Sequence, residues 1–430
     1  MTTQLCQRFS RFNKIEYAIL KSIDWYRKHY TEALCTHKVL TYLNIKDDDN
    51  VKIGIVGNYG NDNNGDEAIL LSIIRQLQKA FGVETQNITV FSNNPKQTAE
   101  RYNVQSAPLY IRGKNAAFTF AKTFRTNTSV VKKLDFLVIG GGGILMDLYK
   151  REAPLYGSYA MMAHSNNVPY VVYGCGAGPL TSSLGQFFIR YMCKHAKNVS
   201  VRDPKSEALL KKIGVQKDIF IIGDPAFSLE ADRKGYSNRP LKIGVTAVPY
   251  YNASYWPSGD EEKYNNYIKG MAKNLDKIID KYGVQIQFYA TKYPQDADVT
   301  KDIQKLMKNP QNTNVLEENL PPQRILEVSS ELDVVIGTRL HSLILATDTQ
   351  TPLIGVSYHT KVNDFMQMAG LGEYSIDIEQ LHKKDDYFER LISKMTNNWP
   401  AAIKLAQKTN ESFKDKAEYG LYLLREGMEQ

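Results

Sequence analysis

The residues best suited to chemistry lie close together in the run Gly337–Ala346. Arg339 and His341 stand two positions apart, directly after the apolar stretch Leu332–Gly337. A guanidinium binds carboxylates and phosphates through paired N–H groups, and an imidazole exchanges protons near neutral pH. The pair therefore indicates an anionic substrate and a proton-transfer residue. The structural alternative is that Arg339 forms a salt bridge to a neighbouring loop while His341 caps a helix.

A second arginine stands in a comparable place. Arg202 closes the short apolar run Val199–Val201 and precedes Asp203, which can cap a helix that begins directly after it. Two guanidiniums at facing sheet edges could clamp a phosphate and a carboxylate bidentately. Arg202 could equally well pair with Asp203 or Asp224.

The loop Gly57–Glu67 is the first of three glycine-rich loops that follow predicted strands. It contains four candidate ligand-binding residues: Asn58, Gly60, Gly65 and Asp66. Backbone amides of such a loop could cradle an anion, or Asp66 and Glu67 could simply favour the start of a helix. The loop lacks Gly-Lys-Ser/Thr and does not match the dinucleotide-binding pattern, so neither of those phosphate sites is indicated.

The other two glycine-rich loops are Gly140–Gly143 and Gly174–Pro179. The first is expected to end a strand and open a helix, either to let a ligand approach the backbone or to make a tight strand–helix crossing. The candidate ligand-binding positions here are Gly141, Gly142, Gly143 and Gly176. Three such loops on successive strand ends predict one lined cleft.

Strands alternate with helices from Val51 onward, which is typical of a parallel sheet covered on both faces. The polar stretch Glu230–Pro240 is the best linker, and the alternation restarts after it. We therefore predict an α/β fold with two doubly wound, Rossmann-like domains that face a cleft. The predicted parts are a helical N-terminal extension (1–50), two domains (51–232 and 241–385) and C-terminal helices (386–430).

Composition narrows the class of protein. A formal charge of +8 suits phosphorylated substrates, an anionic membrane surface or nucleic acid. The sequence has no Lys/Arg track interleaved with aromatics, so nucleic acid is not an expected partner.

The four cysteines lack CxxC spacing, and no His/Asp/Glu cluster has ligand spacing, so no metal site is expected. The absence of a signal core and of a membrane span predicts a cytoplasmic protein. Basic residues in the N-terminal extension leave peripheral membrane association open.

These motifs, in this order and spacing, resemble the polysaccharide pyruvyl transferase family. The resemblance runs from Val51 to about Gly372 through all the loops above, together with Gly223-Asp224-Pro225-Ala226 and Thr338-Arg339-Leu340-His341-Ser342. It implies a fold similar to glycosyltransferase-B enzymes. It also implies transfer of pyruvate from phosphoenolpyruvate to two hydroxyls of a sugar, which gives a cyclic ketal, with no further cofactor.

The resemblance assigns donor binding and catalysis to Arg202, Arg339 and His341. Ser342 belongs to the same motif and is expected to contact the substrate. His359 and Lys361 follow the next strand end and could touch the acceptor or the donor phosphate, or could simply be surface loop residues.

Two other classes of function stay open from the sequence. One is a glycosyltransferase that uses a nucleotide sugar in the same kind of cleft, and the other is a non-catalytic protein that binds anions or sugars. Phosphate release from phosphoenolpyruvate with a sugar acceptor would support the pyruvyl transferase, nucleotide release would support the glycosyltransferase, and absence of turnover with any acceptor would favour the binding protein. The acceptor sugar, its attachment to a lipid carrier and the oligomeric state are not specified by the sequence.

Overall fold

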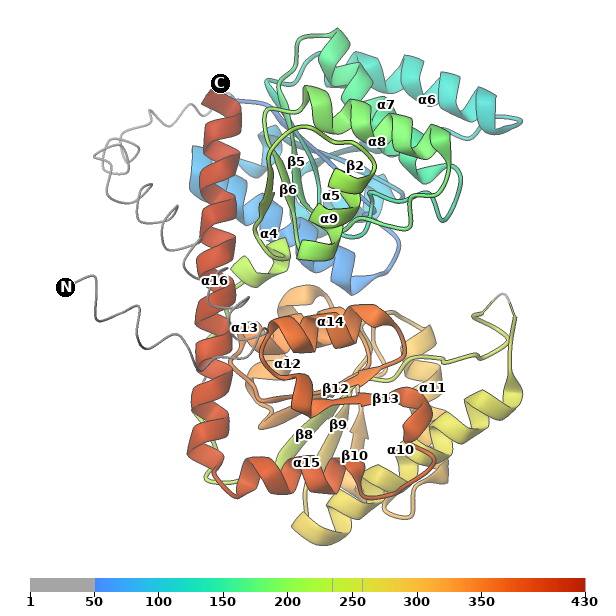
Figure 1. Cartoon of the computed structure of the whole chain (residues 1–430), viewed down its shortest axis with the longest axis vertical. Helices are drawn as coiled ribbons and strands as arrows, with labels where there is room; N and C mark the ends of the chain where they lie inside the picture. The colour runs from blue at the N-terminus through green and yellow to red at the C-terminus, as the bar shows by residue number, and fades with distance from the viewer. Residues whose placement is uncertain (1–50, 234, 257, 430) are drawn as a thin grey trace, which may run out of the picture. The chain divides into compact units, whose positions relative to one another are not determined.

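The computed structural model of the chain describes residues 51–233, 235–256 and 258–429. The predicted helical extension, residues 1–50, lies outside the described residues. The rest forms two parallel sheets flanked by helices (Figure 1), as predicted for an α/β fold. The sheets have seven and six strands.

The first sheet has the strand order β3-β2-β1-β4-β5-β6-β7. Its strands are β1 (Ile53–Val56), β2 (Ile88–Ser92), β3 (Gln105–Pro108), β4 (Phe136–Gly140), β5 (Tyr170–Cys175), β6 (Val199–Val201) and β7 (Ile219–Ile221). Its helices are α4 (Asn64–Phe81), α5 (Pro95–Tyr102), α6 (Ala116–Val131), α7 (Glu152–Ser165), α8 (Ser183–His195) and α9 (Pro204–Lys212), followed by the 3-10 turn η4 (Pro225–Ser228).

Alternate residues of the central strands point into two separate cores. Val138 packs with α4 on one face of β4, whereas Leu137 and Ile139 pack with α6, α7 and α8 on the other. A strand buried on both faces reads as a continuous apolar run, as β4 does. The helices α6, α7 and α8, together with α9, therefore cover this face of the first sheet.

The second sheet has the order β10-β9-β8-β11-β12-β13. Its strands are β8 (Lys242–Val245), β9 (Gln285–Phe288), β10 (Thr313–Val315), β11 (Val334–Gly337), β12 (Leu353–Ser357) and β13 (Ser375–Asp377). Its helices are α10 (Glu261–Tyr282), α11 (Gln295–Leu306), α12 (Pro322–Ser330), α13 (Leu340–Asp348), α14 (Thr360–Met368) and α15 (Tyr387–Thr396). The last helix, α16 (Trp399–Glu429), returns to pack against β5 and α4 of the first sheet.

Several local expectations were wrong, each for a physical reason. The Gly140–Gly143 run does not open a helix, because α7 begins only at Glu152 and the intervening loop makes a bridge between Leu145 and Ala177. The edge strands β3 and β13 were not predicted, since each is short and only partly buried. The predicted domain limits stay a prediction.

Contacts between the two sheets run through the starts of their helices. The Asn64 amide nitrogen donates to the Thr291 carbonyl at 3.0 Å, and the Asn64 side chain lies 3.1 Å from Asn319. Lys205 of α9 pairs with Asp364 of α14 at 2.6 Å. These links bring the carboxyl ends of the strands of both sheets to one place, where the predicted site residues lie.

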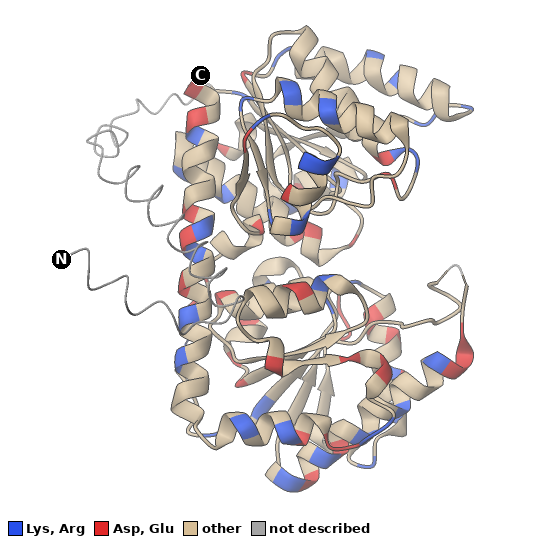
Figure 2. Cartoon of the chain, viewed as in Figure 1, with Lys and Arg blue, Asp and Glu red and all other residues tan. Residues whose placement is uncertain are grey.

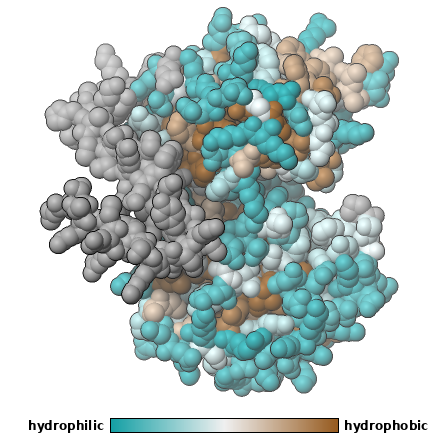
Figure 3. Space-filling model, in the orientation of Figure 1, coloured by the Kyte–Doolittle hydropathy of each residue, from teal (hydrophilic) through white to brown (hydrophobic). Residues whose placement is uncertain are grey.

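Charge is distributed differently over the two sets of helices. Figure 2 shows Lys and Arg together with Asp and Glu on α10, whereas α6 and α8 carry Lys and Arg alone. Figure 3 shows hydrophobic surface among hydrophilic atoms over the upper right of the molecule, where α6 and α8 lie. Within the described part of the chain, none of the helices combines the length and hydropathy of a bilayer span.

Candidate active site

His341 lies in the first turn of α13, directly beyond the carboxyl end of β11. Its Nε2 is 3.7 Å from Oδ2 of Asp224, which follows β7 of the other sheet. Nη1 of Arg202 reaches the same carboxylate oxygen at 3.4 Å, and Nε of Arg202 lies 3.4 Å from Asp203. An imidazole and a guanidinium from different sheets thus converge on one buried carboxylate.

Asp224 is held as an anion at this point. Burial would raise its pKa, but nearby His341 and Arg202, with the Ala226 amide that donates at 3.1 Å, outweigh burial and lower it below its usual range. The His341 ring is mostly buried, and its Nε2 has no hydrogen-bond partner among the described residues. A distance of 3.7 Å is too long for a hydrogen bond, so this buried nitrogen is left without a partner in the described part of the chain.

Asp66, in the first turn of α4, is the second carboxylate of the site. Burial raises its pKa, and the opposing effects of His341 and of the Asn58 amide do not fully offset this. Asn58 and Asn63 donate to Oδ2 of Asp66 at 2.9 and 2.8 Å. The glycine-rich loop therefore wraps around this carboxylate and fixes it beside His341.

Three of the glycines that were expected to bind a ligand lie against charged side chains of the site. A Cβ on Gly65 would lie 2.5 Å from Cγ of His341, and one on Gly176 would lie 2.8 Å from Nε of Arg202. A Cβ on Gly142 would meet Asp66 at 3.0 Å, in a left-handed backbone with φ of 66°. These three glycines make room for the charged groups themselves, in addition to any ligand.

Lys361, in the first turn of α14, brings a further cation to this group. Its side chain is exposed overall, yet Nζ lies 3.8 Å from where a Cβ of Gly143 would be. Burial of the ammonium lowers its pKa, and the positive charge of Arg202 lowers it further. Lys361, Arg202 and His341 thus lie near one another, beside Asp66 and Asp224. We call these five residues the His341 cluster.

Arg339 is engaged in a separate network. Its Nη2 donates to Oδ1 of Asp296 at 2.6 Å and its Nε lies 3.2 Å from the same atom, while Nη1 lies 3.4 Å from the Tyr358 hydroxyl. Tyr255 stacks with its ring centroid 5.7 Å from the guanidinium. Burial would lower the pKa of Arg339, but Asp296 raises it above its usual value. The salt-bridge alternative for Arg339 is therefore present, and its partner lies in α11.

The remaining predicted residues have structural partners. Ser342 is fully buried, donates to the Arg339 carbonyl at 2.7 Å and lies 2.9 Å from Thr246. The Gly60 amide donates to Glu67 at 2.8 Å. A Cβ on Gly141 would overlap Ile69 of α4. His359 occupies the position before α14, is exposed, and has a pKa lowered by partial burial and by Lys361.

Three residues of these networks were not among the sequence candidates. Asp224 was considered only as a rival partner for Arg202, although its place after a strand and before Pro225 was a usable signal. Tyr255 lies in a loop rich in aromatic residues, which was a usable signal, whereas Asp296 lies in a helix and carried none. Their roles depend on contacts between segments that are far apart in the sequence.

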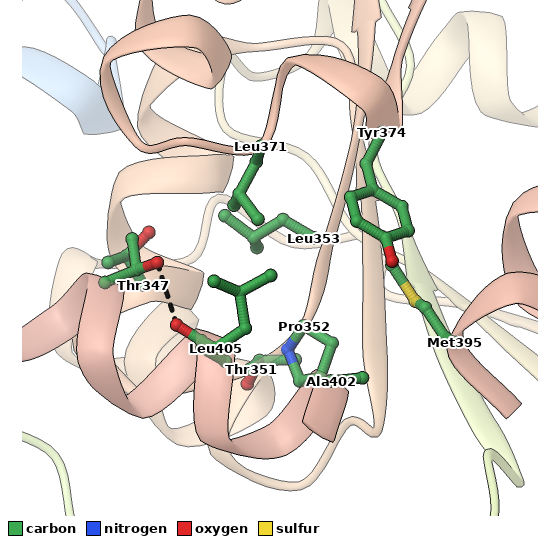
Figure 4. Close-up of a pocket in the computed structure, with 11 residues that line it drawn as sticks. Thr347, Thr351, Pro352, Leu353, Leu371, Tyr374, Met395, Ala402 and Leu405 are labelled. Carbon is green, nitrogen blue, oxygen red and sulfur yellow. Dashed lines mark hydrogen bonds between the residues drawn. The ribbon is translucent and has the colours of Figure 1, made fainter. Parts of the chain in front are cut away.

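An apolar hollow elsewhere, shown in Figure 4, does not belong to this site. It lies where α16 packs on the second sheet and is lined by Leu353, Leu371, Tyr374 and Leu405, among others. About 20 Å³ of free space remains there, which is room for roughly one water. We regard this hollow as a packing defect between α16 and the sheet.

Comparison with known proteins identifies the family. The family model described as polysaccharide pyruvyl transferase matches residues 63–360. The chain belongs to this family. The matched range contains Asp66, Arg202, Asp224, Arg339 and His341. The resemblance seen in the sequence is confirmed.

This polysaccharide pyruvyl transferase family member is also similar to a curated protein over most of its length. The chain is 21% identical over 374 residues to the amylovoran biosynthesis protein AmsJ of Erwinia amylovora, covering 77% of this chain and 89% of that protein.

Solved structures confirm the predicted fold class. MurG of Acinetobacter baumannii has a TM-score of 0.55 at 13% identity, covering 87% of this chain and 99% of that one. The UDP-GlcNAc 2-epimerase of Neisseria meningitidis, solved with UDP-GlcNAc, has a TM-score of 0.53 at 12% identity, with coverage of 87% and 99%. At such identities the likeness concerns the fold alone.

Proposed function

We propose that this protein transfers pyruvate from phosphoenolpyruvate to two hydroxyls of a sugar residue and forms a cyclic ketal. Membership of the polysaccharide pyruvyl transferase family supports a pyruvyl donor and a polysaccharide acceptor. The charge of the His341 cluster suits the donor, which carries about three negative charges when fully ionised. Three cationic or protonatable side chains converge there: Arg202, His341 and Lys361.

The observation that carries the proposal is the state of His341. Its Nε2 is buried, lies beside an ionised Asp224 and has no hydrogen-bond partner in the described part of the chain. A buried polar atom without a partner is costly unless a ligand supplies one. An imidazole in this place can exchange a proton with a bound donor.

The reaction then follows in balanced steps. His341 gives a proton to the methylene carbon of phosphoenolpyruvate, which becomes a methyl group and leaves positive charge on the carbon that bears the phosphate. A first sugar hydroxyl adds to that carbon and gives its proton to the neutral His341, which restores the imidazolium. A second hydroxyl of the same sugar displaces inorganic phosphate, which leaves with the proton of that hydroxyl, and the ring closes. The guanidinium of Arg202 and the ammonium of Lys361 would hold the phosphate and carboxylate through these steps.

Arg339 would act from the opposite side of the same edge. Its guanidinium is oriented by Asp296 and lies beside the rings of Tyr255 and Tyr358. Such rings present flat apolar faces on which a pyranose can pack, with hydroxyl groups at their rim for polar contacts. In this arrangement Arg339 binds a donor oxygen at the border with the acceptor.

Incubation with phosphoenolpyruvate and a panel of glycosides tests the proposal. We expect release of inorganic phosphate and a product heavier than the glycoside by one ketal-linked pyruvate, both detected by mass spectrometry and phosphate assay. A parallel incubation with UDP-sugars serves as the comparison. Nucleotide release there, with no phosphate release from phosphoenolpyruvate, would contradict the proposal and favour a glycosyltransferase.

A further inference from the structure

The starts of α6, α7 and α8 lie along one edge of the first sheet. Each of these helices follows a strand of a parallel sheet and runs back antiparallel to it, so each begins near the carboxyl ends of the strands. The helices lie side by side (Figure 1). Their first turns therefore lie along the edge that also bears the glycine-rich loops and the His341 cluster.

Large apolar side chains are exposed at these helix starts. Five of them, each between 49% and 62% exposed, form what we call the apolar rim: Phe118, Leu148, Tyr149, Leu184 and Phe187. Among the described residues, the other large hydrophobic side chains with comparable exposure are Leu241 and Leu306, in the part of the chain that forms the second sheet. Apolar residues exposed together mark an interaction surface, whereas single ones need no explanation.

Specific contacts hold the parts of the apolar rim together. The buried Asp147 accepts hydrogen bonds from the Thr181 and Ser182 amides at 2.9 and 2.6 Å, which ties the loop that contains Leu148 and Tyr149 to the start of α8. The Arg151 guanidinium lies 5.8 Å from the Tyr110 ring, which links the same loop to the segment before α6. The rim is therefore a built feature of the fold.

The exposed charged residues near the apolar rim are mostly basic, although Asp147 and the half-buried Glu152 flank Leu148 and Tyr149 in the sequence. The sequence contains no Asp or Glu between residues 104 and 134 or between 153 and 202. Phe118, Lys122 and Arg125 follow one another at helical spacing and are all exposed. Further exposed cations flank the rim: Arg112, Lys114, Lys150 and Arg151.

We propose that the apolar rim and its basic border dock onto an anionic phospholipid bilayer. Leu and Phe side chains insert at the level of the headgroups, while Lys and Arg contact lipid phosphates. Aliphatic side chains such as Leu148 and Leu184 offer nothing for a nucleic acid base to stack on, and an acidic protein would not require so many exposed apolar groups. Docking would turn the edge that bears the His341 cluster toward the membrane. A lipid-carried acceptor is the substrate class that suits this orientation, and that last step rests on the proposed function.

Vesicle co-sedimentation of the full chain tests the docking without any substrate. We expect binding to phosphatidylcholine vesicles that contain phosphatidylglycerol, weaker binding to phosphatidylcholine alone, and loss of binding as salt is raised. Leu184→Ser with Phe187→Ser should weaken binding about tenfold or more, because two inserted side chains are lost. Lys114→Gln with Lys122→Gln should weaken it about fivefold for each lysine removed.

Matched changes outside the rim provide the controls. Leu241→Ser with Leu306→Ser alters apolar residues that are 42% and 44% exposed, somewhat less than those of the rim, and Lys273→Gln with Lys277→Gln alters exposed lysines of α10. Both control proteins should bind vesicles as the unaltered chain does. Unchanged binding by the rim variants would overturn the proposal. So would a dimer in light scattering that the rim variants dissociate, since the rim would then be an interface between copies. Lack of pyruvyl transfer with normal vesicle binding would contradict only the proposed function.

Discussion

His341 and Asp224 come from different sheets, and their Nε2 and Oδ2 atoms lie 3.7 Å apart. Neither residue has this neighbour unless both sheets are folded and in contact. The pair therefore couples the assembly of the chain to the chemistry of the site.

Removal of the imidazole should affect the rate more than donor binding. His341→Ala is expected to lower kcat by about 10²–10⁴-fold, the usual contribution of one general acid or base. The KM for phosphoenolpyruvate should change far less. His382→Ala, at an exposed position in the second half of the chain, is the matched control. An unaltered kcat in a folded His341→Ala protein would remove this residue from the mechanism.

A methyl group on Gly65 should displace the His341 ring. The added Cβ would lie 2.5 Å from Cγ of His341, whereas carbon atoms in contact are about 3.5–4.0 Å apart. Gly65→Ala is therefore expected to lower kcat at least about tenfold, although Ala favours a helix more than Gly does. In a His341→Ala background the same change should have little further effect on kcat. Equal losses in both backgrounds would show that Gly65 acts independently of His341.

Arg339 and Arg202 should differ in their effect on stability. Asp296 is fully buried and relies on Arg339 for charge compensation, so Arg339→Ala should lower the free energy of unfolding by about 3–5 kcal/mol. Asp224 keeps His341 and the Ala226 amide when Arg202 is lost, so Arg202→Ala should cost clearly less. Urea unfolding measures both. Equal losses would contradict the separate roles assigned to the two arginines.

Asp348, at the end of α13, should make the protein less stable as pH rises. Its two carboxylate oxygens are buried without a hydrogen-bond partner among the described residues, and burial raises its pKa well above the usual value. The folded chain then keeps a proton that the unfolded chain releases above about pH 3.9, so this stabilisation is present below that pH and is lost as pH rises toward the folded-state pKa.

Thermal unfolding across pH tests the sign of this effect. Asp348→Asn should unfold at a higher temperature than the unaltered chain at neutral pH, and the difference should shrink toward pH 4. Asp415→Asn, at an exposed position of α16, should show no such trend. A gain in stability that is independent of pH would mean that Asp348 does not carry a proton in the folded state.

Much of the fold could be predicted from local patterns. Buried parallel strands such as β4 and β11 read as apolar runs that end in Gly. Such signals survive in the sequence because burial on both faces demands apolar residues at every position. Edge strands are less buried and do not require apolar residues at every position. The strand β3 has a single buried apolar side chain and therefore showed no usable pattern.

The residue types of the site were also visible, since His341, Arg202 and Arg339 follow strands whose carboxyl ends share an edge. The partners of these three residues were not visible in the sequence. Arg202 and Arg339 look alike in the sequence, yet one joins His341 at Asp224 and the other is bound by Asp296. Ionic contacts form across any distance in sequence once packing has excluded water, so no local pattern reports them. The sequence thus specifies which charged and protonatable side chains are available. The packing of one sheet against the other determines which of these side chains come into contact.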